Sequence, residues 1–183
     1  MKKLAFALAA TGMLALANVS APAVASVETY EAKAEASSAA AIARADMYEA
    51  FGDARLAPGK YLWRDVPASA GEERVVVSLG DQLAFLYRGD TLMAVTTISS
   101  GTAKNPTPTG IFNIHTKKTM HRSRKYENAP MPFAQFIDQY GVALHAGHNP
   151  GHPASHGCIR LPAQFAAKLY KVTDVGTPVL IGA

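Results

Sequence analysis

Residues 145–160 read HAGHNPGHPASHGCIR and hold four of the six histidines of this 183-residue chain together with its only cysteine, Cys158. The glycines and prolines in this stretch break any helical register, so the histidine spacing cannot come from one face of a helix. We predict a shaped loop that follows a short buried strand over residues 142–144. We expect Ile159 and Leu161 to anchor the far end of the loop in the core.

The residue types in this loop indicate a nucleophile site. A thiol attacks a carbonyl carbon as the thiolate, and near neutral pH it needs a neighbouring base or positive charge to reach that state. His156 lies two residues from Cys158, where the turn can aim it elsewhere. His145 can approach across the loop from the neighbouring strand. We therefore predict Cys158 as nucleophile and His145 as base, with His156 as the alternative base.

The first 25 residues have the pattern of a secretory signal peptide. Lys2 and Lys3 precede an apolar stretch over residues 4–17, and Ala23-Val24-Ala25 forms a small-residue cleavage site. We therefore expect an exported protein in the periplasm or cell envelope. No second long apolar segment follows that would cross a membrane. Without the two lysines the charges nearly balance, so the composition gives no indication of a nucleic-acid partner.

A single cysteine is unusual in an exported protein. In an oxidising compartment a structural cysteine normally has a disulfide partner, and Cys158 has none within the chain. The thiol therefore indicates either catalysis or intermolecular pairing. A buried, inert cysteine is the alternative.

Residues 26–73 are rich in alanine and small polar residues, and we predict a spacer that is in part helical. Residues 31–51 favour a helix because alanine has a high helix propensity and Ile42, Met47 and Phe51 form a sparse apolar stripe. A partly ordered spacer is the alternative for this segment.

From residue 74 the pattern changes to strands. The β-rich runs 74–79, 82–88 and 91–99 are separated by the turn dipeptides Gly80-Asp81 and Gly89-Asp90, which predicts an antiparallel meander. We expect a loop over 101–110 and a further strand over 111–116.

The rest of the chain completes the predicted domain. We interpret residues 128–133 as a loop wall beside a groove, with Met131 and Phe133 exposed. Pro162 suits the first position of a helix with a stripe of Phe165, Leu169 and Val172, and a last strand covers 177–181. The predicted catalytic domain, residues 74–183, is mainly β, a β-rich mixed sandwich or barrel-like fold with one or two short helices.

The motif SHGCIR at residues 155–160, with His145 upstream, resembles the signature of the L,D-transpeptidase (YkuD-like) catalytic domain family of bacterial cell-wall enzymes. The likeness extends to TPTGIF at 107–112 and to YENAPMPF at 126–133. The resemblance implies that the cysteine attacks the carbonyl at the L-centre of meso-diaminopimelate in a peptidoglycan stem tetrapeptide and that D-alanine leaves. The acyl group then passes to an amine of a second stem peptide, giving a 3-3 cross-link, to a protein amine or to a D-amino acid. Transfer to water would make the enzyme an L,D-carboxypeptidase.

The resemblance also implies roles for individual residues. Cys158 matches the nucleophile and His145 the base, with the Ala146 carbonyl orienting the imidazole. Ser155, His156 and Gly157 match the approach to the cysteine, and the backbone N–H groups around Gly157 and Cys158 are expected to be oxyanion donors. We assign Arg160 to loop structure or to a substrate carboxylate, and Tyr126, Met131 and Phe133 to the substrate groove. No cofactor or metal is implied, and carbapenems are expected to acylate Cys158.

One departure and two alternatives accompany this interpretation. Ser155 follows His145 by ten positions, a shorter loop than in many family members, which bears on substrate choice. The side chains of His145, His148, His152 and Cys158 are also potential ligands of a catalytic zinc ion. A non-catalytic module that binds peptidoglycan is the second alternative.

Overall fold

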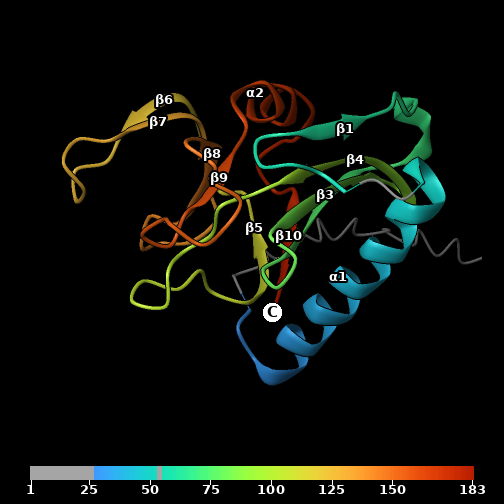
Figure 1. The fold of residues 1–183 in the computed structure, drawn as a ribbon, viewed down its shortest axis with the longest axis horizontal. Helices are drawn as coiled ribbons and strands as arrows, with labels where there is room; N and C mark the ends of the chain where they lie inside the picture. The colour runs from blue at the N-terminus through green and yellow to red at the C-terminus, as the bar shows by residue number, and fades with distance from the viewer. Residues whose placement is uncertain (1–26, 53–54) are drawn as a thin grey trace, which may run out of the picture.

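Two β-sheets and two α-helices make up residues 27–52 and 55–183, the part of the chain that this computed structural model describes (Figure 1). The predicted signal peptide lies outside the described residues. The helices are α1 (Tyr30–Phe51) and α2 (Ala163–Val172), with a short 3-10 helix over Ala68–Ala70. The strands are β1 (Tyr61–Trp63), β2 (Glu73–Ser78), β3 (Leu83–Arg88), β4 (Thr91–Thr97), β5 (Gly110–Asn113), β6 (Thr116–Arg122), β7 (Pro130–Phe136), β8 (Ala143–Ala146), β9 (Ile159–Leu161) and β10 (Pro178–Gly182).

The larger sheet has six strands in the order β1-β4-β3-β2-β10-β5. Strands β2, β3 and β4 pair antiparallel through the two predicted turns, so the expected meander is confirmed. The C-terminal strand β10 lies in the interior of this sheet, parallel to β2 and antiparallel to β5. The sheet therefore depends on pairing between residues about a hundred positions apart, such as Val75 and Val179.

The predicted helix over residues 31–51 is present as α1. The Thr29 hydroxyl caps its first turn by accepting from the Ala32 N–H at 3.3 Å, and Gly52 ends it with a φ of 75°. Alanines at four-residue spacing place a narrow face against the sheet, and a Cβ on Gly182 of β10 would lie 2.7 Å from the Ala36 carbonyl oxygen. The helix therefore packs directly on the sheet, as a partly ordered spacer would not, and its 22 residues nearly coincide with the predicted range.

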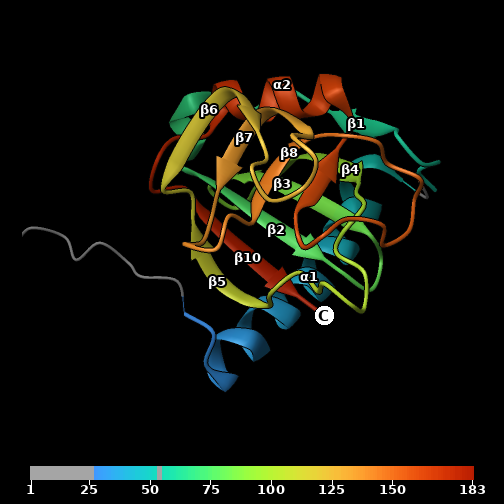
Figure 2. The ribbon, with the colours of Figure 1, turned by 90° about the vertical axis from the view of Figure 1, so that its left-hand side faces the viewer.

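The smaller sheet has the order β6-β7-β8-β9 and lies in front of the larger sheet in the view of Figure 2. The predicted strand over 111–116 is divided between β5 and the start of β6. The prediction of a loop over 128–133 is wrong, because most of that stretch belongs to β7. Within β7, only Gln135 and Phe136 pair with β8, so the outer part of β7 has one open side. Pro130 and Pro132 lie in that part, where a strand tolerates a missing N–H.

Two apolar cores hold the layers together. Val75 and Val77 face the core shared by the two sheets and α2, whereas Val76 faces the core under α1. A strand buried on both faces explains the uninterrupted valine run in β2. Phe165 and Leu169 of α2 are buried as predicted, although Pro162 is the N-cap, one position before the expected place. No helix among the described residues is long and apolar enough to cross a membrane.

Candidate active site

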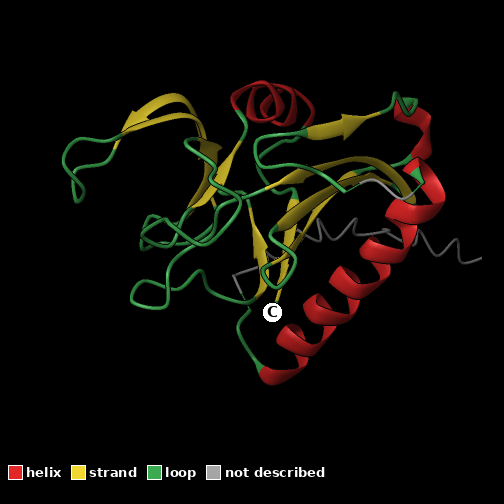
Figure 3. Cartoon of the chain, in the orientation of Figure 1, coloured by secondary structure: helices red, strands yellow, loops and turns green. Residues whose placement is uncertain are grey.

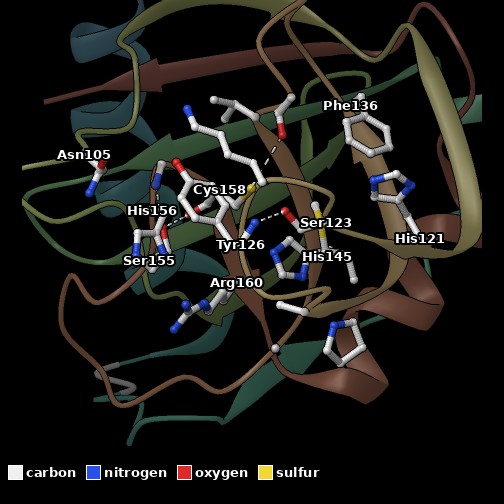
Figure 4. Close-up of a pocket in the computed structure, with 18 of the residues that line it drawn as sticks. Asn105, His121, Ser123, Tyr126, Phe136, His145, Ser155, His156, Cys158 and Arg160 are labelled. Carbon is white, nitrogen blue, oxygen red and sulfur yellow. Dashed lines mark hydrogen bonds between the residues drawn. The ribbon is translucent and has the colours of Figure 1, made fainter.

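A cavity of about 1030 Å³ opens where the ends of the smaller sheet meet the long loops, which Figure 3 shows gathered beside the β6–β7 hairpin. Its walls are the tip of that hairpin, the loop 98–109, and the loop 147–158, which we call the cysteine loop. Of the ten residues predicted for the site, nine line this cavity, and Phe133 does not. Figure 4 shows Cys158, His145, His156, Tyr126 and Arg160 around the opening.

Ser155 braces the turn that precedes the cysteine. Its side chain is buried, and its hydroxyl donates to the Cys158 carbonyl and accepts from the Gly157 N–H at 3.1 Å. Gly157 has a φ of 113°, a left-handed conformation that strains any residue with a Cβ. The Ser-His-Gly-Cys order therefore has a local physical basis, because the serine closes the turn and the glycine permits it.

Thr107 ties the loop 98–109 to the same turn. Its hydroxyl donates to the Gly157 carbonyl at 2.8 Å and accepts from the Gly101 N–H at 2.8 Å. The backbone of Ser100 accepts from the N–H groups of Ala154 and Ser155, which adds a second tie. Sequence reasoning gave Thr107 no role. Its place between two prolines, which restrict the local backbone, is the signal that marks it.

His145 lies in β8, and its side chain is buried. Its Nδ1 atom is 2.8 Å from the Ala146 carbonyl oxygen. A carbonyl only accepts, so Nδ1 carries the proton and Nε2 is left with a free lone pair. Burial, followed by the charges of Arg160 and His121, lowers the pKa of His145, and the bond to Ala146 opposes them. The imidazole is therefore neutral at neutral pH and available as a base.

Cys158 is partly buried at the end of the cysteine loop, and its thiol donates to the Gly141 carbonyl at 3.7 Å. Burial raises the pKa of the thiol, and the Asp138 carboxylate adds to this effect. A backbone hydrogen bond with Ala143 and the Arg160 guanidinium act in the opposite direction. The net direction keeps the resting thiol protonated.

Comparison with protein families identifies the domain that carries these residues. Residues 72–181 match the family model of the L,D-transpeptidase catalytic domain, YkuD. The match covers more than half of the chain. The chain belongs to this family. The resemblance seen in the sequence motifs is therefore confirmed, as is the mainly β fold. No curated protein matches the chain.

Solved L,D-transpeptidase structures have the same fold. The enzyme from Mycobacterium smegmatis aligns with a TM-score of 0.57 at 23% identity, over 61% of this chain and 59% of its own. The enzyme from Xylanimonas cellulosilytica aligns with a TM-score of 0.54 at 27% identity, over 65% of this chain and 64% of its own. L,D-transpeptidase 3 from Mycobacterium tuberculosis, in complex with a faropenem-derived adduct, aligns with a TM-score of 0.56 at 19% identity, over 61% of this chain and 60% of its own. The chain thus spans less than two thirds of each of these structures.

Within this L,D-transpeptidase domain, His156 faces the hairpin. Its exposed imidazole stacks on the Tyr126 ring, with 4.3 Å between centroids and 20° between planes. The Lys125 ammonium also lies over the Tyr126 ring, 5.4 Å from its centroid. The stack joins the hairpin tip to the cysteine loop across the cavity. The imidazole of His156 is therefore directed toward the hairpin.

The two predicted groove residues on β7 have different surroundings. Met131 lines the cavity but is only 6% exposed, so the expectation of an exposed side chain is wrong. Phe133 packs on Tyr170 of α2, with 5.9 Å between ring centroids, and has a φ of 56°. This unusual backbone conformation interrupts the regular alternation of β7. Placing Phe133 in the groove was therefore wrong.

The described residues of the L,D-transpeptidase domain do not assemble the alternative zinc site. His148 and His152 are exposed on the cysteine loop. In residues 27–52 and 55–183, no group of three or more histidine, cysteine, aspartate or glutamate side chains lies close enough to hold a metal ion. The donor geometry therefore gives the zinc alternative no support.

The cavity has a strongly basic lining. Lys104, Arg124, Lys125 and Arg160 contribute to it from three different segments. Among the described residues that line it, none is an aspartate or glutamate. The cations of residues 121–125 carry no local pattern that connects them to the site, because only the fold brings the hairpin tip to the cysteine. An uncompensated positive lining favours a ligand with several carboxylates.

Proposed function

We propose that this protein is a peptidoglycan L,D-transpeptidase in which Cys158 is the nucleophile and His145 its base. The observation that carries this proposal is the fixed, neutral imidazole of His145 in the same cavity as the chain's single thiol. Family membership supplies the reaction class. The basic lining supports the substrate class, because peptidoglycan stem peptides carry several carboxylates.

In the proposed reaction, His145 Nε2 takes the thiol proton as Cys158 Sγ attacks the carbonyl carbon at the L-centre of meso-diaminopimelate. The resulting imidazolium gives that proton to the amine of D-alanine as the C–N bond breaks, which leaves a thioester on Cys158. An acceptor amine then attacks the thioester and loses its proton to His145. The Cys158 thiolate leaves and recovers its proton from the imidazolium.

The oxyanion donors need one revision. The Gly157 N–H already donates to the Ser155 hydroxyl, so it is engaged within the turn. We therefore assign the Cys158 N–H as the first oxyanion donor. We assign Arg160, which lines the cavity, to a carboxylate of the stem peptide. The substrate is a polymer of the cell envelope, which agrees with the predicted export signal.

The experiment is incubation of the protein with a purified disaccharide tetrapeptide, followed by mass analysis of the products. A 3-3 linked dimer with loss of one D-alanine is the expected product. A tripeptide without dimer identifies water as acceptor and an L,D-carboxypeptidase, whereas binding without any product identifies a non-catalytic module.

The matched variants are Cys158→Ala and Cys158→Ser. We expect both to keep the circular dichroism spectrum and to lose turnover, because a serine hydroxyl stays protonated without a stronger base. Turnover at the wild-type rate in Cys158→Ala would exclude the covalent mechanism.

A further inference from the structure

A tight turn over residues 138–142 forms the wall of the cavity between β7 and β8. Asp138 begins this turn, and its side chain is only 9% exposed. Its Oδ1 atom accepts from the Tyr140 N–H at 2.9 Å and from the Val142 N–H at 2.8 Å. The Ile137 N–H donates to the Val142 carbonyl at 3.0 Å and closes the base of the turn. One carboxylate oxygen therefore holds the backbone of residues 139–142 in place.

The backbone of this turn contacts the thiol. The Gly141 carbonyl accepts from the Cys158 Sγ–H, and Ala143, the first residue of β8, makes a backbone hydrogen bond with the same thiol. Gly141 has a φ of 95°, so the direction of its carbonyl depends on a left-handed conformation that the Asp138 side chain stabilises. Tyr140, Gly141 and Val142 also line the cavity.

We propose that Asp138 is a positioning residue, which holds the turn 138–142 so that the Gly141 carbonyl remains the hydrogen-bond acceptor of the Cys158 thiol in the resting enzyme. This proposal rests on the proposed function, in which Cys158 is the nucleophile. Asp138 itself touches no reacting atom. It acts through the backbone that faces the sulfur.

The consequence is a nucleophile that keeps its proton until substrate arrives. A carbonyl dipole aimed at sulfur favours the thiol and disfavours the thiolate, and the Asp138 charge raises the pKa of Cys158 in the same direction. The other charged or titratable groups that line the cavity are Arg160 on β9, His145 on β8, His156 on the cysteine loop, Tyr140 on the turn 138–142, Lys104 on the loop 98–109, and His121, Arg124, Lys125 and Tyr126 on the hairpin. Thiol oxidation follows thiolate character, so this arrangement protects a lone cysteine in an exported protein.

The test compares alkylation of the thiol with turnover in three variants. Alkylation by iodoacetamide is followed by intact mass over pH 6 to about 10, a range chosen to bracket ordinary thiol pKa values. Asp138→Asn keeps an oxygen acceptor for the two N–H groups but removes the charge. We expect turnover of the tetrapeptide within about threefold of wild type, with alkylation several-fold faster near neutral pH because less thiol is held protonated.

Asp138→Ala removes both the acceptor and the charge. We expect alkylation near neutral pH at least as fast as in Asp138→Asn, and turnover lower by about tenfold or more because the cavity wall relaxes. Gly141→Ala is the second variant in case Asp138→Ala does not fold. A Cβ at Gly141 has nothing within 4 Å, so this change strains the backbone without a clash and should shift both readouts in the same directions.

Asp90→Asn is the matched control, since Asp90 is an exposed carboxylate that does not line the cavity. Three results would overturn the proposal: an unchanged alkylation profile in both Asp138 variants, an equal shift in Asp90→Asn, or wild-type turnover in Asp138→Ala. Alkylation needs no substrate. If the wild-type protein failed to turn over the tetrapeptide, the proposed function would fall while the alkylation profiles still decided the role of Asp138.

Discussion

Burial shifts the pKa values of the two central side chains of this site in opposite directions. It disfavours the charged form of each, so the pKa of the Cys158 thiol rises and that of the His145 imidazole falls. A resting thiolate–imidazolium pair is therefore disfavoured, and the neutral pair predominates. Because the pKa of His145 lies below its usual range, the imidazole remains a proton acceptor through neutral pH. The thiolate population grows only as the pH rises toward the raised pKa of Cys158.

The first residue-scale prediction concerns His145→Gln. We expect turnover to fall by about 10²- to 10⁴-fold, the usual contribution of a general base. Alkylation of Cys158 at neutral pH should also slow, because both processes need the thiolate. At strongly alkaline pH, where solvent removes the proton, the alkylation rates of the variant and wild type should converge. The measurement is the alkylation rate by mass spectrometry across pH.

His152→Gln is the control for this change, because His152 is an exposed histidine of the same loop that does not line the cavity. It should match wild type in both readouts. Equal alkylation of wild type and His145→Gln at every pH would remove His145 as the base and return His156 to that position.

At the scale of elements, α1 is part of the packed domain, although its alanine-rich composition is typical of a spacer. Its buried face consists mainly of alanines, so it adds little apolar area for each residue, but it approaches the sheet closely. The Tyr87 hydroxyl on β3 donates to the Asp46 carboxylate on α1 at 2.6 Å. Met47 reaches the core with Phe85 and Val95. The helix thus covers a sheet face that would otherwise expose large apolar side chains.

The element-scale prediction tests this close approach with Gly182→Ala. The added Cβ would meet the backbone of Ala36 and Ser37 at 2.7 Å, so the helix must shift outward. We expect the free energy of unfolding to fall by about 1–3 kcal/mol, the usual cost of overpacking. The measurement is chemical denaturation followed by circular dichroism.

Gly80→Ala is the matched substitution. A Cβ there lies 3.8 Å from Ala183, an ordinary contact, and Gly80 has no left-handed φ. Its unfolding free energy should stay within about 0.5 kcal/mol of wild type. A Gly182→Ala protein as stable as Gly80→Ala would show that α1 does not pack against β10 in solution.

At the scale of the whole molecule, the site is assembled where segments distant in the sequence meet. β8 and the cysteine loop that follows it supply the proposed base and nucleophile, and the loop 98–109 locks the turn through Thr107. The β6–β7 hairpin closes the remaining side through the Tyr126–His156 stack. Since each segment is held by the sheets, the geometry of the cavity depends on the complete domain.

The whole-molecule prediction is acylation by a carbapenem. The strained lactam carbonyl resembles the reacting carbonyl of a stem peptide, so the same thiol and oxyanion donor should act on it. We expect intact-mass spectrometry to show one adduct, and peptide mapping to place it on Cys158. The short loop between His145 and Ser155 should affect the rate of acylation or hydrolysis rather than the site of attack. An adduct on another residue, or none with an enzyme proved active on tetrapeptide, would contradict the assignment.

The amino-acid sequence by itself determined the features that depend on local chemistry and periodicity. Alternation and turn dipeptides predicted the β2–β3–β4 meander, and the apolar stripe predicted α2. The resemblance of the SHGCIR motif to its family marked the turn before Cys158, and the left-handed glycine and bracing hydroxyl found there are local features of that motif. These features could be predicted because each is settled by residues within a few positions of one another.

Only the tertiary structure decided which distant groups share the cavity. Asp138, Thr107 and the cations of the hairpin carry no local pattern that connects them to Cys158, and the sheets bring them there. The prolines of β7 predicted a loop, because proline lacks the N–H that a paired strand donates. They fit a strand here because that part of β7 has no partner on one side. The alanine-rich segment could be assigned to the core only after β10 and its glycine provided a surface close enough to pack against. Long-range pairing determines these features, and a single sequence records it only indirectly.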